Sequence, residues 1–178
     1  MIGKIIPFFL TAILISCGPN KIKEETKNIE APENGIWIST STDAFINKVL
    51  GSGGTIRGFS LGDSISKIKT YENLEQFEET AEHIGYTFST TDGEVVDVLY
   101  MYDSSNTLSE VQLDVYLNSD SISNAVSEAL GLYFTQKYGK PLLDIGQPTW
   151  EIADSQKVVI MNIATKLDRG LQVNFMKD

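Results

Sequence analysis

Two neighbouring segments in which apolar and polar residues alternate restrict the fold more than any other feature of the chain. The apolar positions are Val96, Val98, Tyr100 and Tyr102 in the first segment and Val111, Leu113, Val115 and Leu117 in the second. Alternation at every second residue is typical of a strand with one buried face, and the polar residues 103–106 between the segments predict a turn. The sequence therefore predicts an antiparallel hairpin. One face packs on the core, and the other, which carries Glu110, Gln112 and Asp114, meets water.

Helical spacing of apolar residues predicts helices before and after this hairpin. The longest covers residues 122–138, with Asp120 or Ser121 as its cap and Gly139 and Pro141 after its end. Thr42 or Asp43 is the expected cap of a helix over residues 45–50, and Asp63 or Ser64 is the expected cap of another. Residues 71–82 are polar enough to form the solvated face of a helix. Further strands are predicted at residues 55–60, 86–89, 149–152, 157–165 and 171–176, with a final turn at 168–170.

A short internal repeat links the two halves of the chain. Residues 63–66 read Asp-Ser-Ile-Ser and recur at residues 120–123, each time at the expected start of a helix. We therefore predict an α+β fold made of two helix-then-three-strand repeats, residues 55–118 and 119–178, that form an antiparallel sheet with helices packed on one face. Both repeats belong to a single expected domain, residues 35–178.

Two turn segments connect this pattern with a known group of proteins. Residues 58–63 read Gly-Phe-Ser-Leu-Gly-Asp before a helix, and residues 137–141 read Lys-Tyr-Gly-Lys-Pro after one. The arrangement resembles the tandem-repeat domains of the β-lactamase-inhibitor-protein type and the small outer-membrane assembly lipoproteins that share their fold. The resemblance implies a non-catalytic protein that binds other proteins.

The N-terminal segment predicts where the protein works. Lys4 precedes an apolar run, residues 5–15, that is too short to span a bilayer as a helix, and the run ends at Leu14-Ile15-Ser16-Cys17. These residues resemble the lipobox of bacterial lipoproteins, which implies removal of residues 1–16 and a lipid on Cys17. Residues 17–34 are polar and predict a flexible tether. The protein is thus expected in the bacterial cell envelope, with the outer membrane favoured.

Composition excludes several classes of function. A formal charge of −10 argues against binding to nucleic acid and favours basic partners. One histidine and one cysteine, itself the expected site of the lipid, do not provide a common zinc site. Asp92, Glu94 and Asp97 lack the ligand spacing of a calcium loop. We therefore predict no metal and no cofactor.

Two enzyme-like motifs have simpler interpretations. Gly58-Phe59-Ser60-Leu61-Gly62 matches the nucleophile elbow of serine hydrolases, which would require His83 beside Ser60. The rest of that fold is missing, so a glycine-containing turn is the preferred interpretation. Gly51-Ser52-Gly53-Gly54 lacks the Lys and Ser or Thr that follow in a phosphate-binding loop, and is interpreted as a linker.

These observations predict a non-catalytic, lipid-anchored protein that binds another envelope or secreted protein. Tyr116 lies on the wet side of its predicted strand with Asp114 and Gln112, and these three residues are the predicted contact with the partner. One alternative is a carrier that holds a small apolar ligand between the sheet and the helix over residues 122–138. The other is the serine hydrolase acting through Ser60.

Overall fold

Eight strands and three helices make up the part of the chain that the computed structural model describes, which is residues 37–90, 93–144, 146–152, 155–166 and 168–177. The helices are α1 (Trp37–Leu50), α2 (Ile65–Tyr71) and α3 (Asp120–Tyr138). The strands are β1 (Glu75–Glu79), β2 (His83–Ser89), β3 (Val95–Tyr102), β4 (Leu108–Leu117), β5 (Leu142–Asp144), β6 (Gln147–Ile152), β7 (Gln156–Asn162) and β8 (Arg169–Lys177).

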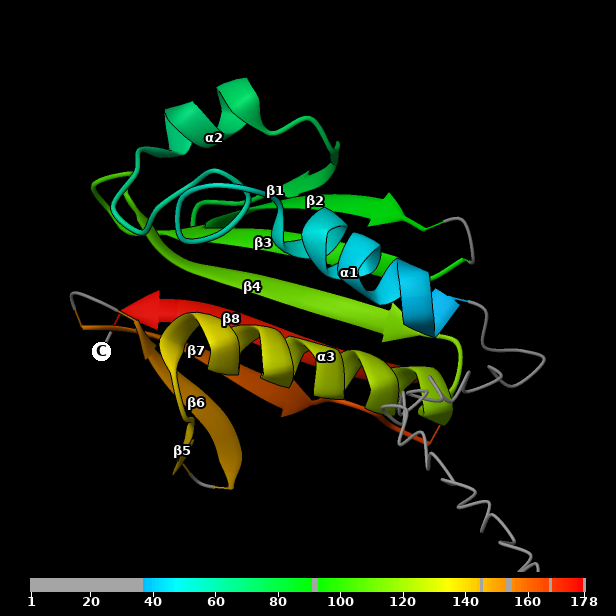
Figure 1. Ribbon diagram of the computed structural model, residues 1–178. Helices are drawn as coiled ribbons and strands as arrows, with labels where there is room; N and C mark the ends of the chain where they lie inside the picture. Colours follow the sequence, from blue (N-terminus) through cyan, green and yellow to red (C-terminus); the bar gives the residue numbers. More distant parts are fainter. Residues whose placement is uncertain (1–36, 91–92, 145, 153–154, 167, 178) are drawn as a thin grey trace, which may run out of the picture. The chain divides into compact units, whose positions relative to one another are not determined.

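All eight strands form one antiparallel sheet in the order β1-β2-β3-β4-β8-β7-β6-β5. The first four strands follow one another as a meander, and so do the last four. The two meanders join where β4 pairs with β8 at the centre of the sheet, as the neighbouring green and red arrows of Figure 1 show. The pairing of β4 with β8 runs from Glu110↔Met176 to Leu117↔Arg169. It therefore brings together residues that are about sixty positions apart in the sequence.

The hairpin predicted from alternation is confirmed. β3 and β4 pair along their length, and the apolar residues Val96, Val98, Val111 and Leu113 are 0% exposed. The turn between the strands is held by Asp103, whose carboxylate accepts the N–H groups of Ser105 at 2.9 Å and Thr107 at 3.1 Å. A side chain that bonds its own backbone two residues on is the usual way in which Asp forms a turn.

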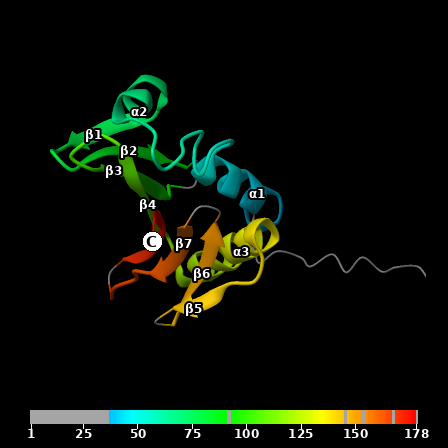
Figure 2. The same cartoon turned by 90° about the vertical axis from the view of Figure 1, so that its left-hand side faces the viewer.

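The core lies between this sheet and the helices on one of its faces. Figures 1 and 2 show α1 and α3 on the same side of β4 and β8, and the two helices pack against each other. The buried face of α3 consists of Val126, Leu130 and Phe134, each at most 1% exposed. Phe134 meets Trp150 of β6 at 5.5 Å and Phe175 of β8 at 5.8 Å between ring centres. The space beneath this part of α3 is filled by aromatic side chains.

The predicted fold class was wrong. The protein is mostly a single eight-stranded antiparallel sheet, with four strands after α2 and four after α3 in place of three. Of the three described helices, only α3 is a long helix packed against the sheet. The prediction missed β1 and β5. Every residue of β1 and β5 is exposed, so neither strand has the apolar alternation from which a strand is recognised.

Several predicted boundaries also changed. Ser64 caps α2 as expected, but Ser119 caps α3, one residue before the predicted cap. α1 begins at Trp37, upstream of the predicted cap. Residues 55–60 form turns around a single bridge between Ile56 and Phe59 and no strand. The segment taken for a helical face contains β1, and the predicted final turn lies partly within β8.

In the described ranges, none of the helices has the length and hydropathy needed to cross a membrane.

Candidate functional site

The face of the sheet opposite α1 and α3 is the candidate site, and no described helix covers it (Figure 2). Strand register places its side chains in four rows that run across the sheet, and we call this surface the helix-free face. The first row is His83, Met101, Glu110, Met176, Lys157 and Glu151. The second is Gly85, Leu99, Gln112, Asn174, Val159 and Thr149. The third is Thr87, Asp97, Asp114, Gln172 and Met161, and the fourth is Ser89, Val95, Tyr116 and Gly170.

A chain of hydrogen bonds runs through the centre of this face. Asp114 accepts the amide of Gln112 at 2.9 Å through one oxygen and the amide of Gln172 at 2.7 Å through the other. The oxygen of the Gln172 amide in turn accepts the Asn174 amide at 3.4 Å. β4 and β8 alternate these amides and carboxylates with core residues, so the pairing of the two strands brings the polar groups together. These hydrogen bonds hold the four polar side chains in one arrangement.

The last group in this series of hydrogen bonds is an acceptor that receives no hydrogen bond from a described residue. Asn174 is 7% exposed, and its Oδ1 has no hydrogen-bond partner among the described residues. A buried acceptor left unpaired costs on the order of 1–3 kcal/mol. A molecule that binds this face and supplies an N–H or O–H would remove that cost.

Carboxylates give the same face a negative charge. Asp97 lies directly opposite Asp114 across β3 and β4, and like charges in this position repel. Glu110 lies between Met101 and Met176 in its row, and no hydrogen bond or ion pair joins its carboxylate to another described residue. Burial among these neighbours raises the pKa of the Glu110 carboxyl above its usual value. The arrangement therefore favours a ligand that carries positive charge.

Tyr116 lies at one end of the helix-free face and is 40% exposed. It lines a hollow of about 330 Å³ with Gly93, Val95, Leu117, Asn118, Asp168 and Arg169. Burial, and then the carboxylates of Asp114, Asp97 and Asp168, raise the pKa of the Tyr116 hydroxyl. The hydroxyl is consequently a hydrogen-bond donor at any physiological pH, beside a hollow that a side chain of a partner can enter.

Apolar side chains flank the polar centre on both sides. Leu99 and Met101 of β3 lie on one side, and Val159 and Met161 of β7 lie on the other, all half-buried. Met176 adds a third methionine near the middle. Methionine is flexible and polarizable, and it is common on surfaces that bind other proteins. A polar centre with apolar flanks offers both specific pairing and apolar area to a protein surface.

The predicted contact residues are placed together. Gln112, Asp114 and Tyr116 project from one face of β4, although Asp114 is only 9% exposed and is already paired with two amides. Sequence reasoning missed Asp97, Gln172 and Asn174, which complete the centre. Their period-2 spacing within β3 and β8 is visible in the sequence, but their neighbours across the sheet are not. Cys17 lies outside the described residues, as do residues 1–16 and the tether.

The pair required by a serine hydrolase is not formed. The His83 ring is bonded within its own hairpin, to Thr80 at 3.1 Å and to Glu78 at 2.9 Å. The backbone N–H of Ser60 donates to Asp63 in a turn, and no bond joins Ser60 to His83. Among the residues outside the gaps of the structure, no group of three or more potential metal ligands is found. Glu94 accepts hydrogen bonds from Thr90 and Asn118, and Asp92 lies outside the described residues.

Comparison of the chain with protein-family models, curated proteins and solved structures finds no significant match. The resemblance to inhibitor-type binding domains therefore stays a prediction.

Proposed function

We propose that this protein is a non-catalytic binding module of the bacterial cell envelope that holds another envelope or secreted protein on its helix-free face. The lipid predicted on Cys17 would anchor it, with the outer membrane as the favoured location. The observation that carries the proposal is the buried, unpaired Oδ1 of Asn174 at the end of a fixed polar chain. A protein surface supplies the donor and the positive charge that this face lacks, and apolar area that can pack on its flanks.

Charge decides which kind of protein fits. Asp97 and Asp114 lie side by side in the third row, and Glu110 lies two rows away on the same strand as Asp114. An incoming Lys or Arg side chain is attracted to this centre and can donate to Asn174, whereas an acidic partner is repelled. Nucleic acid is disfavoured for the same reason, because its phosphates would meet a protein of formal charge −10.

The alternative functions have less support. The carrier of an apolar ligand needs an empty space directly beneath α3, where Phe134 instead packs against Trp150 and Phe175. The hydrolase needs a bond between Ser60 and His83, and their bonds go elsewhere. Protein binding uses the features of the helix-free face as they stand.

Site-specific crosslinking in living cells tests the proposal. A photoreactive phenylalanine analogue replaces Tyr116 in the full lipidated chain, and cells are irradiated before membranes are isolated. We expect one dominant protein adduct. The matched control carries the same analogue at Tyr71, an exposed tyrosine of α2 outside the helix-free face, and should give no such adduct.

Two further variants separate the face from the anchor. Asn174→Ala in the crosslinking chain should lower the adduct yield because it removes the acceptor from the face, and Cys17→Ala should lower it by releasing the protein from the membrane. With the identified partner purified, Tyr116→Ala should weaken binding by about tenfold or more, as expected for an aromatic contact residue. Equal adducts from positions 116 and 71, or no protein adduct at all, would reject the proposal.

A further inference from the structure

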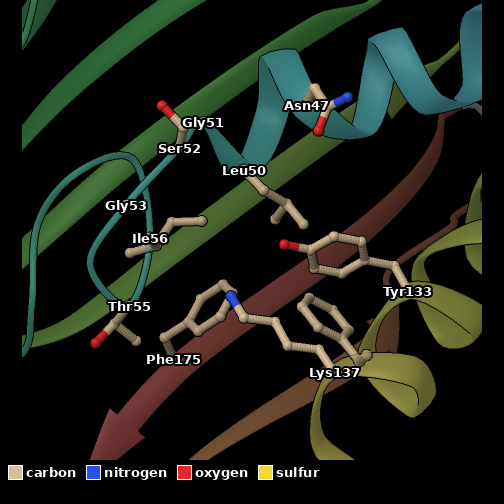
Figure 3. Close-up of a pocket in the computed structure, with 11 residues that line it drawn as sticks. Asn47, Leu50, Gly51, Ser52, Gly53, Thr55, Ile56, Tyr133, Lys137 and Phe175 are labelled. Atoms are coloured by element: carbon tan, nitrogen blue, oxygen red, sulfur yellow. The ribbon is translucent and has the colours of Figure 1, made fainter.

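A second cavity lies on the opposite side of the sheet from the helix-free face, beside α1 and α3. It has a volume of about 240 Å³ and lies between the end of α1, the glycine-rich loop after it, the last turns of α3, and β8. Its lining residues, shown in Figure 3, are Asn47, Leu50, Gly51, Ser52, Gly53, Thr55, Ile56, Tyr133, Phe134, Lys137 and Phe175.

The loop beside this cavity contains backbone N–H groups that are not used within the fold. Gly51, Gly53 and Gly54 have backbone φ angles of 65°, 80° and 63°, which residues with a side chain rarely adopt. The consecutive N–H groups of Ser52, Gly53 and Gly54 donate to no acceptor in the described parts of the chain. Successive free N–H groups in such a turn form a concavity that favours anions.

Arg57 binds the carbonyl groups at the end of α1, which would otherwise repel an anion in this cavity. The last carbonyl groups of a helix carry partial negative charge. At the end of α1 these carbonyls are occupied, because Arg57 donates its backbone N–H to Leu50 at 2.7 Å and its guanidinium to the carbonyls of Lys48 at 2.8 Å and Val49 at 3.2 Å. The free N–H groups therefore dominate the electrostatics of the loop.

Lys137 brings a full positive charge to the same space. In Figure 3 it extends from α3 toward Ile56 and the ring of Phe175, and the Tyr133 hydroxyl points into the same space. Its ammonium lies 5.6 Å from the ring centre of Tyr133 and 5.1 Å from that of Tyr138. It forms no ion pair with any described carboxylate, although acidic residues outnumber basic ones 24 to 14. Burial would lower the pKa of Lys137, but the two tyrosine hydroxyls outweigh it and raise the pKa, so the group stays charged.

The rest of the lining is apolar below and hydroxylated at the rim. Leu50, Ile56, Phe134 and Phe175 are at most 5% exposed and form the floor. Ser52, Thr55 and Tyr133 add hydroxyl groups around it. The volume equals that of about eight water molecules in the liquid, at ~30 Å³ each. A ligand that fits is consequently small, with an anionic end and an apolar body.

We propose that this cavity binds a small organic carboxylate, with the carboxylate between Lys137 and the N–H groups of Ser52 and Gly53 and its apolar body on Leu50, Ile56 and Phe175. One cation and a set of neutral donors match a single negative charge. Inorganic phosphate carries more charge and has no apolar part for the floor, so it is the poorer fit. The cavity shares no lining residue with the helix-free face, so this proposal does not depend on the proposed protein binding.

Titration with benzoate tests the proposal. The full chain is labelled with ¹⁵N-glycine, which limits the spectrum to its 14 glycines, and is studied in uncharged detergent micelles. We expect saturable shifts of the Gly51 and Gly53 resonances, because both residues line the cavity. Gly131 and Gly146 do not line it, and their resonances should stay in place. Benzyl alcohol, which lacks the charge, and inorganic phosphate, which lacks the apolar body, should each bind at least about tenfold more weakly than benzoate.

A charge substitution assigns the binding to Lys137. Lys137→Gln keeps much of the stem that covers the two tyrosines but removes the ammonium, and should weaken benzoate binding by about tenfold or more. Lys140→Gln changes an exposed lysine three residues further on that does not line the cavity, and should leave binding unchanged. Unchanged glycine resonances in the absence of benzoate would show that both variants are folded. Equal affinity of the two variants, or benzyl alcohol binding as tightly as benzoate, would overturn the proposal.

Discussion

Arg57 and Glu72 form a bidentate ion pair in the interior, with nitrogen-to-oxygen distances of 3.0 Å and 3.1 Å. The Glu72 side chain is only 3% exposed, and the Tyr100 hydroxyl donates to the same carboxylate at 2.5 Å. Because Arg57 also binds the end of α1, this cluster joins α1, the end of α2 and β3. The cluster therefore ties together three elements that are distant in the sequence.

Removing the carboxylate charge should destabilise the protein strongly. Glu72→Gln leaves the Arg57 guanidinium buried without a counter-charge, and loss of one partner of a buried pair costs about 3–5 kcal/mol. Urea unfolding of the full chain in micelles, followed by tryptophan fluorescence, measures the free energy of unfolding. The control is Glu79→Gln, which breaks an exposed pair with Lys69 and should leave the unfolding midpoint in place. Equal midpoints for both variants would contradict the role of the buried pair.

The same pair should make stability depend on acid pH. Burial would raise the pKa of the Glu72 carboxyl, but the hydrogen bonds from Arg57 and Tyr100 outweigh it and hold the pKa below its usual range. A lowered folded-state pKa stabilises the fold above the unfolded pKa of about 4.3, and this contribution is lost as pH falls through the folded-state value. Unfolding midpoints at pH 7, 5, 4 and 3 should therefore converge between the wild type and Glu72→Gln in acid. A constant gap across that series would exclude this linkage.

The packing of α3 gives a second test of the core. Phe134 is 1% exposed and contacts aromatic rings of β6 and β8, so Phe134→Ala should cost about 3–5 kcal/mol through the cavity that it leaves. Leu132 lies on the same helix but is 58% exposed, and Leu132→Ala should change stability by less than about 0.5 kcal/mol. Denaturant unfolding of the two variants compares them directly, and a Phe134→Ala cost below about 1 kcal/mol would show a loosely packed interface.

Local patterns in the sequence predicted the central hairpin, the α2 cap and the approximate span of α3, because each depends on residues close in the chain. Strand β1 escaped prediction because its five residues are all exposed. Tyr100 was correctly placed in the core, but its partner Glu72 is 28 residues away, and no local pattern connects the two. The same reason limits the site: Asp114 and Gln112 are neighbours on one strand, whereas Gln172 reaches Asp114 only through the pairing of β4 with β8. The glycine loop was interpreted as a linker because its charged neighbour, Lys137, is on a helix far away in the sequence. Only the folded structure brings the two together.

The opposed carboxylates of Asp97 and Asp114 should cost stability that partner binding recovers. Asp97→Asn removes a like charge directly across β3 and β4, and we expect a gain of about 0.2–1 kcal/mol in the free energy of unfolding. It should also weaken binding of a basic partner, most clearly at low salt where charges are least screened. Unfolding curves and binding at two salt concentrations test both effects. A variant that is less stable than the wild type would show that Asp97 has a structural role.

Glu110 should have the opposite pH signature to Glu72, which makes the two a pair of controls for each other. Burial raises the pKa of the Glu110 carboxyl, so its charged form is disfavoured in the folded protein. A raised folded-state pKa stabilises the fold fully below the unfolded pKa of about 4.3, and this contribution is lost as pH rises through the folded-state value. Glu110→Gln should therefore raise the thermal midpoint at pH 7, by up to about 2 °C for a partly exposed group in a chain of this size.

That gain should disappear below about pH 4, where Glu110 is protonated in both states. Glu128→Gln, on the exposed side of α3, is the matched control and should show no such pH dependence. A natural charge that destabilises the free protein is best understood if a bound partner neutralises it, so Glu110→Gln should weaken partner binding while it stabilises the fold. Melting curves at pH 4 and 7, together with binding of the crosslinked partner, separate the two effects. A variant that binds as well as the wild type would place Glu110 outside the contact and confine the binding surface to the rows of Asp114 and Tyr116.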